Sequence, residues 1–257
     1  MLTHAFEKSH LLIFGHRGSP LRFPENSLLS FKEAMNAGAD GIECDVRLSR
    51  DYQVFVFHDE KVLRLTHQKG SFKDYFARDI KKLDLGYPFG ISRKIQIPTL
   101  EELLTSLGKR SLFYIELKGN FSLETQMHLL AQKTMNVLKK LELIDRSILV
   151  SFDYKVIRWI KKKNPKYMTG LNFSKLEELN ASRKDHFHYL DCLCPQFSLL
   201  NPSLMKEAKD HSLDVMTWVV NTKKDLCKAI RLGVKGVVTD DPKRVVRGKK
   251  KLGLGLK

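Results

Sequence analysis

Gly41-Ile42-Glu43-Cys44-Asp45-Val46-Arg47-Leu48 is an apolar run that contains two acidic residues, and Val54-Phe55-Val56-Phe57 follows shortly after it. Both runs are rich in β-branched and aromatic residues, which predicts strands over 41–48 and 53–58. The connection between them is too short for a parallel crossover, which needs about a dozen residues. We therefore expect an antiparallel hairpin.

The predicted hairpin would place three polar side chains on the same face. A two-residue loop at Arg50-Asp51 would place Asp45 opposite Val56 and Glu43 opposite His58. Side chains two residues apart share a face of a strand. This register predicts that Glu43, Asp45 and His58 project to the same side, and a slip of one residue would remove the prediction.

Strand-like and helix-like segments alternate along the rest of the chain. Further strands are expected over 11–15, 112–117, 147–151, 168–173, 189–194, 214–220 and 235–239. Helices are expected over 27–37, 99–108, 122–142, 153–163, 202–211 and 222–232. Strands that alternate with helices indicate a parallel sheet, and about eight such units indicate a closed barrel. We predict an α/β fold, a TIM-like (β/α)8 barrel.

The length of 257 residues suits one large domain. We expect the barrel to occupy 10–246. Residues 60–98 break the strand–helix rhythm and are rich in charged and aromatic residues, so we interpret them as an inserted subdomain that caps the site. Residues 247–257 are basic and Gly-rich, which is typical of a frayed tail.

The composition limits the classes of function. A formal net charge of +16 favours anionic partners such as phosphate esters, with weak docking on anionic membranes as a further option. No apolar run is long enough to cross a membrane and no signal-peptide pattern is visible, which predicts a cytoplasmic location. The chain shows no motif of a dedicated nucleic-acid binder. The cysteines form no C-x-x-C pair and are expected to be reduced core thiols: Cys44, Cys192, Cys194 and Cys227.

Three carboxylates stand within predicted strands: Glu43, Asp45 and Glu116. They are hard oxygen ligands, which suit Ca²⁺ or Mg²⁺ better than zinc. The alternative is that they pair with the abundant Lys and Arg residues. A divalent cation would act as a Lewis acid on a phosphate oxygen.

Basic side chains also follow predicted strands. Arg17 and Lys118 could bind the same phosphate, Arg through its planar fork and Lys as a point charge. His16 and His58 could supply the acid and the base that break a P–O bond, because their ordinary pKa lies near neutrality. Together these residues suggest a phosphodiesterase.

At this point the sequence resembles the glycerophosphodiester phosphodiesterase family. The matching strings run in the family's order from residue 15 to residue 240, and their combination is highly specific although no single string is. They are Gly15-His16-Arg17-Gly18, Pro24-Glu25-Asn26-Ser27, Gly38-Ala39-Asp40-Gly41-Ile42-Glu43-Cys44-Asp45-Val46, Val56-Phe57-His58-Asp59, Ile97-Pro98-Thr99-Leu100-Glu101-Glu102, Ile115-Glu116-Leu117-Lys118, Trp218-Val219-Val220-Asn221 and Gly236-Val237-Val238-Thr239-Asp240.

The resemblance implies a TIM-like barrel with a small insertion, which hydrolyses deacylated phospholipids such as glycerophosphocholine or glycerophosphoethanolamine to glycerol 3-phosphate and an alcohol. It implies that His16 and His58 are the general acid/base pair. The roles implied for the other residues are one divalent cation held by Glu43, Asp45 and Glu116, phosphate contacts from Arg17 and Lys118, an ordering role for Glu25 and Asn26, and a pocket wall at Trp218.

Other functions remain open at this stage. A lysophospholipase D would act on lipids that keep one acyl chain, and a non-catalytic phosphoester-binding barrel would have lost a His or a carboxylate. The sequence departs from the family at Tyr52, where the usual turn reads Asp-Gly, and over 64–70. Attack by water and attack by a neighbouring substrate hydroxyl are both compatible with these residues, and the oligomeric state is not predicted.

Overall fold

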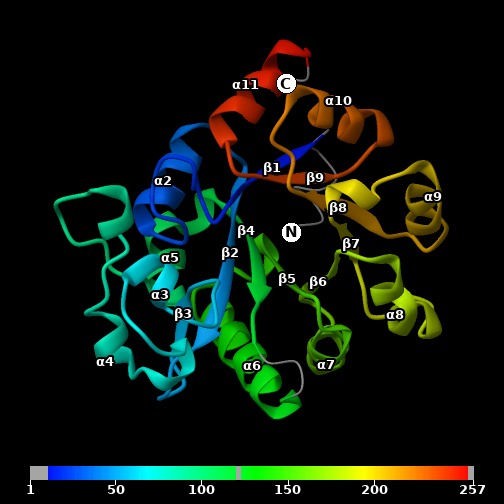
Figure 1. Cartoon of the computed structure of the whole chain (residues 1–257). Helices are drawn as coiled ribbons and strands as arrows, with labels where there is room; N and C mark the ends of the chain where they lie inside the picture. Colours follow the sequence, from blue (N-terminus) through cyan, green and yellow to red (C-terminus); the bar gives the residue numbers. More distant parts are fainter. Residues whose placement is uncertain (1–10, 120–122, 254–257) are drawn as a thin grey trace.

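The computed structural model describes residues 11–119 and 123–253 and shows a ring of strands surrounded by helices (Figure 1). The strands are β1 (Leu12–His16), β2 (Gly41–Leu48), β3 (Val54–Val56), β4 (Leu112–Leu117), β5 (Ser147–Ser151), β6 (Met168–Phe173), β7 (Cys192–Pro195), β8 (Asp214–Trp218) and β9 (Gly236–Thr239). Their order in the sheet is β1-β9-β8-β7-β6-β5-β4-β2-β3, and β1 also pairs with β2. That last pairing closes a barrel of eight parallel strands, as predicted.

β3 is the antiparallel strand outside the barrel, and its register differs from the prediction by one residue. Val46 lies opposite Val56 and Leu48 opposite Val54. The loop has three residues, because the Ser49 amide bonds to the carbonyl of Gln53, and Tyr52 adopts a positive φ of 60°. Three-residue hairpin loops end in such a left-handed residue. The predicted pairings of Asp45 with Val56 and of Glu43 with His58 are therefore wrong.

Alternation along the strands builds two apolar layers. Leu12, Phe14, Tyr114, Val150 and Val238 belong to a cluster inside the barrel. The residues that alternate with these along each strand point outward. They join a larger apolar cluster between the strands and the helices. In β2 the outward position is Cys44, so Glu43 and Asp45 point inward. Cys44 is a free, buried thiol, as expected.

The long helices match the predicted ranges closely. They are α2 (Leu28–Asn36), α5 (Leu100–Leu107), α6 (Glu124–Lys140), α7 (Tyr154–Lys163), α9 (Pro202–Asp210) and α10 (Lys223–Leu232). Short helices that were not predicted are α8 (Asn180–Lys184), η3 (Gly108–Arg110), η4 (Ile144–Arg146), η5 (Leu176–Leu179) and η6 (Phe197–Leu199). Side-chain N-cap bonds begin three of these helices, at Ser27, Thr99 and Asn201, which are residue types that favour this position.

A further helix, α11 (Pro242–Lys251), corrects the predicted tail. Asp241 caps this helix, Pro242 occupies its first turn, and Lys249 Nζ donates to the carbonyl of Leu11. Residues 247–251 are therefore helical, and residues 254–257 lie outside the described part of the chain. No helix in the described part is long and apolar enough to span a membrane.

Residues 60–98 form short elements beside β3, at the side of the barrel (Figure 1). The elements are α3 (Leu63–Thr66), η1 (Phe72–Asp74), α4 (Ala77–Ile80) and η2 (Tyr87–Phe89). They pack around their own apolar cluster, in which Phe55 and Phe57 from the β3 region meet Phe72 and Ile80. This cluster anchors the insertion to the hairpin.

Candidate active site

The polar residues lie at the inward positions where barrel strands end. His16 closes β1 two residues after Phe14, and Glu116 stands two residues after Tyr114 in β4. Trp218 closes β8. The C-terminal ends of parallel barrel strands meet on one face, which is where barrel enzymes place their catalytic groups.

One pocket of about 220 Å³ contains most of the residues predicted from the sequence. Its lining includes His16, Arg17, Glu43, His58, Glu116, Lys118 and Trp218. Asp45 lies beneath this pocket as a buried neighbour of Glu43 and Glu116, and Glu25 and Asn26 contact its walls. His58 therefore lies in one pocket with Glu43 and Glu116 even though the predicted register is wrong, because it follows β3, which ends at Val56, and is not held in the hairpin pairing.

The turn after β1 aims two groups at Glu43. Arg17 and Gly18 have φ angles of 51° and 91°. A Cβ on Gly18 would lie 2.4 Å from Ser30 Oγ, so only glycine fits there. In this turn the Arg17 amide donates to Glu43 Oε2 at 2.9 Å, and His16 Nε2 lies 4.0 Å from the same oxygen.

Glu43, Asp45 and Glu116 form a buried acidic cluster. One oxygen from each lies within 4.8 Å of the others. Burial and the neighbouring Asp45 carboxylate raise the pKa of Glu43 to about 8. Burial also raises the pKa of Glu116. At Asp45 burial is outweighed by the charges of Lys118 and Arg17, which lower the pKa of that carboxyl.

The basic groups of the site partly balance this cluster. Lys118 Nζ lies 2.6 Å from Glu116 Oε1 and 3.5 Å from Asp45 Oδ1. Arg17 Nε lies 3.1 Å from Asp45 Oδ2. Asn26, which is fully buried with a φ of 56°, donates from Nδ2 to the same carboxylate at 3.0 Å. The alternative interpretation of the sequence, in which these carboxylates pair with Lys and Arg side chains, is thus correct in part.

The cluster nevertheless fits a cation. Asp45 Oδ1 and Glu116 Oε1 are buried and receive no well-directed hydrogen bond from the described residues. Buried carboxylate oxygens without hydrogen bonds are costly. The raised pKa values of Glu43 and Glu116 point the same way, since burial and the neighbouring Asp45 carboxylate outweigh the positive charges beside both carboxyls. Three oxygen donors of this kind suit a hard divalent ion.

His16 is held by a pair of residues that the sequence analysis left without a role. Its Nδ1 lies 2.6 Å from Asp240 Oδ1, just after β9. Asn221 donates to the other oxygen of Asp240 at 2.7 Å and accepts from the Asp240 amide. Burial alone would lower the pKa of His16, but the bond to Asp240 and the Glu43 charge raise it above its ordinary value.

His58 stands in a parallel arrangement. Its Nδ1 lies 2.7 Å from Asp59 Oδ1. Arg64 of α3 donates two bonds to Asp59 and two to Glu25, all between 2.6 and 3.0 Å. Glu25 in turn accepts from Arg17 Nη1 at 2.8 Å. A continuous chain of ion pairs thus joins both sides of the pocket through the insertion.

An aromatic wall completes the pocket. Trp218 donates from Nε1 to the carbonyl of Cys194 at 2.9 Å, and its ring meets Phe152 edge to face. Tyr114 donates to Asn172 Oδ1 at 2.6 Å within the buried floor. Sequence reasoning missed Tyr114, Phe152 and Asn172, although each lies at or just beyond an inward strand position.

Comparison with known proteins agrees with this geometry. A sequence model of the glycerophosphoryl diester phosphodiesterase family matches residues 16–244. The chain belongs to this family. It is 34% identical over 239 residues to a glycerophosphodiester phosphodiesterase of Caldanaerobacter subterraneus, an alignment that covers 91% of this chain and 96% of the relative. The chain is thus a phosphodiesterase of the hydrolase class.

Solved structures of family members share the barrel. A putative glycerophosphoryl diester phosphodiesterase of Silicibacter pomeroyi superposes with a TM-score of 0.84 at 25% identity, covering 96% of both chains. A phosphodiesterase of Oleispira antarctica, solved with the product sn-glycerol-3-phosphate, also gives a TM-score of 0.84 at 25% identity and covers 93% of this chain and 96% of its own. The prediction of a phosphodiesterase from the sequence is confirmed.

Proposed function

We propose that this enzyme hydrolyses small glycerophosphodiesters, such as glycerophosphocholine or glycerophosphoethanolamine, with His16 and His58 as its general acid/base pair. The carrying observation is that both imidazoles bind an aspartate through Nδ1 and stand in one pocket with a buried acidic cluster. The relative from Oleispira antarctica holds glycerol 3-phosphate, which supports the same product here.

The two histidines divide the proton transfers. One accepts the proton of the attacking oxygen, from water or from a neighbouring substrate hydroxyl, as that oxygen bonds to phosphorus. The other gives a proton to the departing oxygen as its bond to phosphorus breaks. If the hydroxyl attacks, water opens the resulting cyclic phosphate in a second step. Because Asp240 and Asp59 occupy the Nδ1 atoms of His16 and His58, each Nε2 is left to face the substrate.

The acidic cluster would hold one divalent cation, Mg²⁺ or Ca²⁺, through Glu43, Asp45 and Glu116. When bound, such an ion supplies Lewis-acid stabilisation of phosphate charge. Arg17 and Lys118 bind the phosphate oxygens as fixed positive groups. Glu25 and Asn26 orient Arg17 and Asp45 through the bonds described above.

Trp218 lines the part of the pocket that takes an organic arm of the substrate. A pocket of about 220 Å³ has room for a small polar group rather than for an acyl chain. We therefore expect glycerophosphodiesters to be better substrates than lysolipids. The strongly basic composition allows weak docking on anionic membranes, which salt would screen.

The test compares kcat/KM for glycerophosphoethanolamine and lysophosphatidylethanolamine at low and high salt. We expect the water-soluble diester to be cleaved more efficiently in both conditions, with release of glycerol 3-phosphate. A lysolipid preference that persists at high salt would instead support a lysophospholipase D. Binding of both compounds without turnover of either would support a non-catalytic phosphoester-binding barrel.

A further inference from the structure

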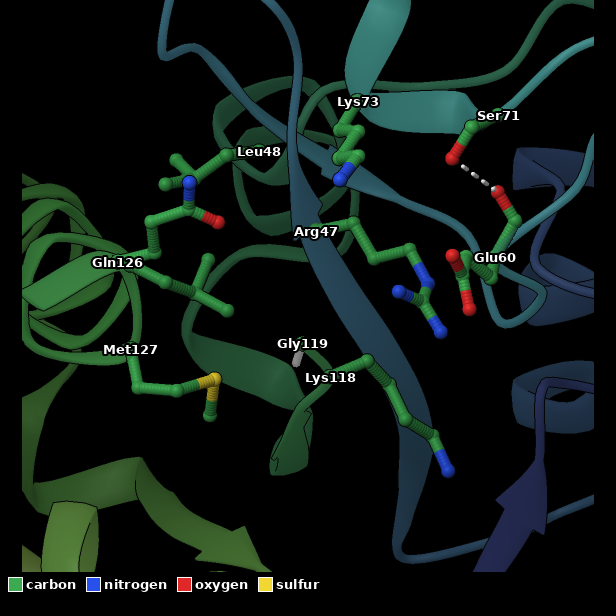
Figure 2. Close-up of a pocket in the computed structure, with 10 residues that line it drawn as sticks. Arg47, Leu48, Glu60, Ser71, Lys73, Lys118, Gly119, Gln126 and Met127 are labelled. Carbon is green, nitrogen blue, oxygen red and sulfur yellow. Dashed lines mark hydrogen bonds between the residues drawn. The ribbon is translucent and has the colours of Figure 1, made fainter. Parts of the chain in front are cut away.

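A second cavity, of about 110 Å³, lies beside the catalytic pocket. Figure 2 shows Arg47, Lys73 and Glu60 around it, with Lys118 on its lower side. Lys118 also lines the catalytic pocket. The two cavities therefore share one wall, and that wall is a side chain expected to bind phosphate.

Arg47 connects the second cavity to the catalytic machinery. It belongs to β2, and its Nε donates to the carbonyl of His58 at 2.8 Å. Its two terminal nitrogens form no hydrogen bond or ion pair with the described residues, although the side chain is half-buried. Arg47 is thus a half-buried cation that forms no ion pair within the described part of the chain.

The other charged side chains around the cavity also leave an excess of unpaired positive charge. Lys73 is exposed and has no ion pair in the described part of the chain. Lys118 is already engaged by Glu116 and Asp45. Glu60 is the one carboxylate among the lining residues; its backbone carbonyl accepts from Ser71 Oγ, the bond drawn in Figure 2. Two unpaired cations thus face the cavity together with one acidic group.

A phosphodiester has two organic arms, and two cavities flank Lys118. The aromatic pocket beside Trp218 suits the uncharged glycerol arm. We propose that the cavity at Arg47 and Lys73 binds the head group, and that it selects a head group which carries a carboxylate. Glu60 can accept a hydrogen bond from an ammonium or hydroxyl of the same group. This proposal deepens the proposed function and rests on it.

Two substrates that differ by one carboxylate provide the test: glycerophosphoserine and glycerophosphoethanolamine. The ratio of their kcat/KM values isolates head-group recognition, because both share the glycerol arm and the chemical step. We expect the wild-type enzyme to favour glycerophosphoserine by about ten-fold or more, the factor typical of a charge-assisted contact. Measurement at high salt removes general attraction by the basic surface.

Variants then assign the preference to the cavity. Lys73→Gln should lower the ratio by about two- to five-fold, as for an exposed ion pair. Arg47→Gln should lower it by about ten-fold or more, because its guanidinium is half-buried. Arg47→Gln also loses the bond to His58, but this affects both substrates alike. Lys69→Gln removes the same charge from an exposed position outside the cavity and should leave the ratio unchanged.

The outcomes separate this proposal from the function on which it rests. Cleavage of both substrates with a ratio near one, or with a preference for glycerophosphoethanolamine, would overturn the head-group proposal alone. A preference that the Arg47 and Lys73 variants do not change would overturn it as well. Failure to cleave either substrate would contradict the proposed function.

Discussion

Nδ1 of His16 lies 2.6 Å from Oδ1 of Asp240, although 224 positions separate the two residues in the chain. Pairing of β1 with β9 brings them together, and Asn221 fixes the carboxylate from β8's side of the pocket. An aspartate in this position sets which imidazole nitrogen carries the proton and how the ring is oriented. Asp240 is therefore a positioning residue for His16.

Replacing Asp240 with Asn should keep the shape of the site and reverse the hydrogen bond to Nδ1. The imidazole would then carry its proton on the wrong nitrogen, so we expect kcat to fall by about 10²–10⁴-fold with a smaller change in KM. Steady-state kinetics with glycerophosphoethanolamine measure this. Asp145→Asn, an exposed and unpaired position in the described chain, is the control. A wild-type kcat in D240N would show that Asp240 does not position His16 for catalysis.

The acid/base assignment predicts a particular pattern in the histidine variants. His16→Ala and His58→Ala should each lower kcat by at least about 10²–10⁴-fold. The double variant should be little worse than the weaker single variant, because the pair acts as a unit. His188→Ala changes an exposed histidine that contacts Tyr189 and should keep full activity. If both single variants kept most of the wild-type activity, the acid/base assignment would be wrong.

Arg64 joins Asp59 to Glu25, and so it should position His58 and Arg17 together. We expect Arg64→Ala to lower kcat by about ten-fold or more, since charge-assisted bonds are lost at both carboxylates. Half of the Arg64 side chain is exposed, so free guanidinium can enter the gap. Millimolar guanidinium should restore part of the activity.

The control for this experiment is Arg78→Ala, which removes an arginine of the same insertion that is 80% exposed. It should lose no activity and gain none from guanidinium. If Arg64→Ala lost activity that guanidinium did not restore, and melted at a lower temperature, Arg64 would be a stabilising residue only.

Metal binding can be tested without an activity assay. A ligand that binds only the folded state raises its stability in proportion to the logarithm of ligand concentration. Mg²⁺ or Ca²⁺ should therefore raise the Tm of the wild-type chain. Glu116→Gln keeps the shape of the side chain and removes one ligand charge, so the shift should shrink or vanish while the chain stays folded. An equal shift in both proteins would place the ion elsewhere.

The barrel could be predicted from sequence because its strands are continuous apolar runs and its helices carry caps such as Thr99 and Asn201. The hairpin register could not. Non-glycine residues rarely adopt positive φ, so nothing in the sequence favours the three-residue loop that Tyr52 permits. The helix α11 had a signal in Asp241-Pro242, but its run of basic residues looked like a tail.

The site was predictable where its residues stand on regular strands, as Glu43, Asp45 and Glu116 do. Arg64 was not, because it lies in an irregular insertion where no periodicity relates position to direction. Asp240 and Asn221 stood in the strings that carry the family resemblance, and their places at strand ends were the signal. Their hydrogen bonds to each other and to His16 depend on how β1, β8 and β9 close the barrel. This tertiary arrangement cannot be deduced from the local sequence.

The most direct test of the central claim, that an acidic cluster and two histidines make this barrel a metal-dependent phosphodiesterase, is metal removal with the product as readout. Purified enzyme is incubated with glycerophosphoethanolamine, and glycerol 3-phosphate is measured in excess EDTA and again after excess Mg²⁺ or Ca²⁺ is added. We predict that EDTA abolishes release and that one of the two ions restores it, in wild type but not in Glu116→Gln. Full release in excess EDTA would contradict the account.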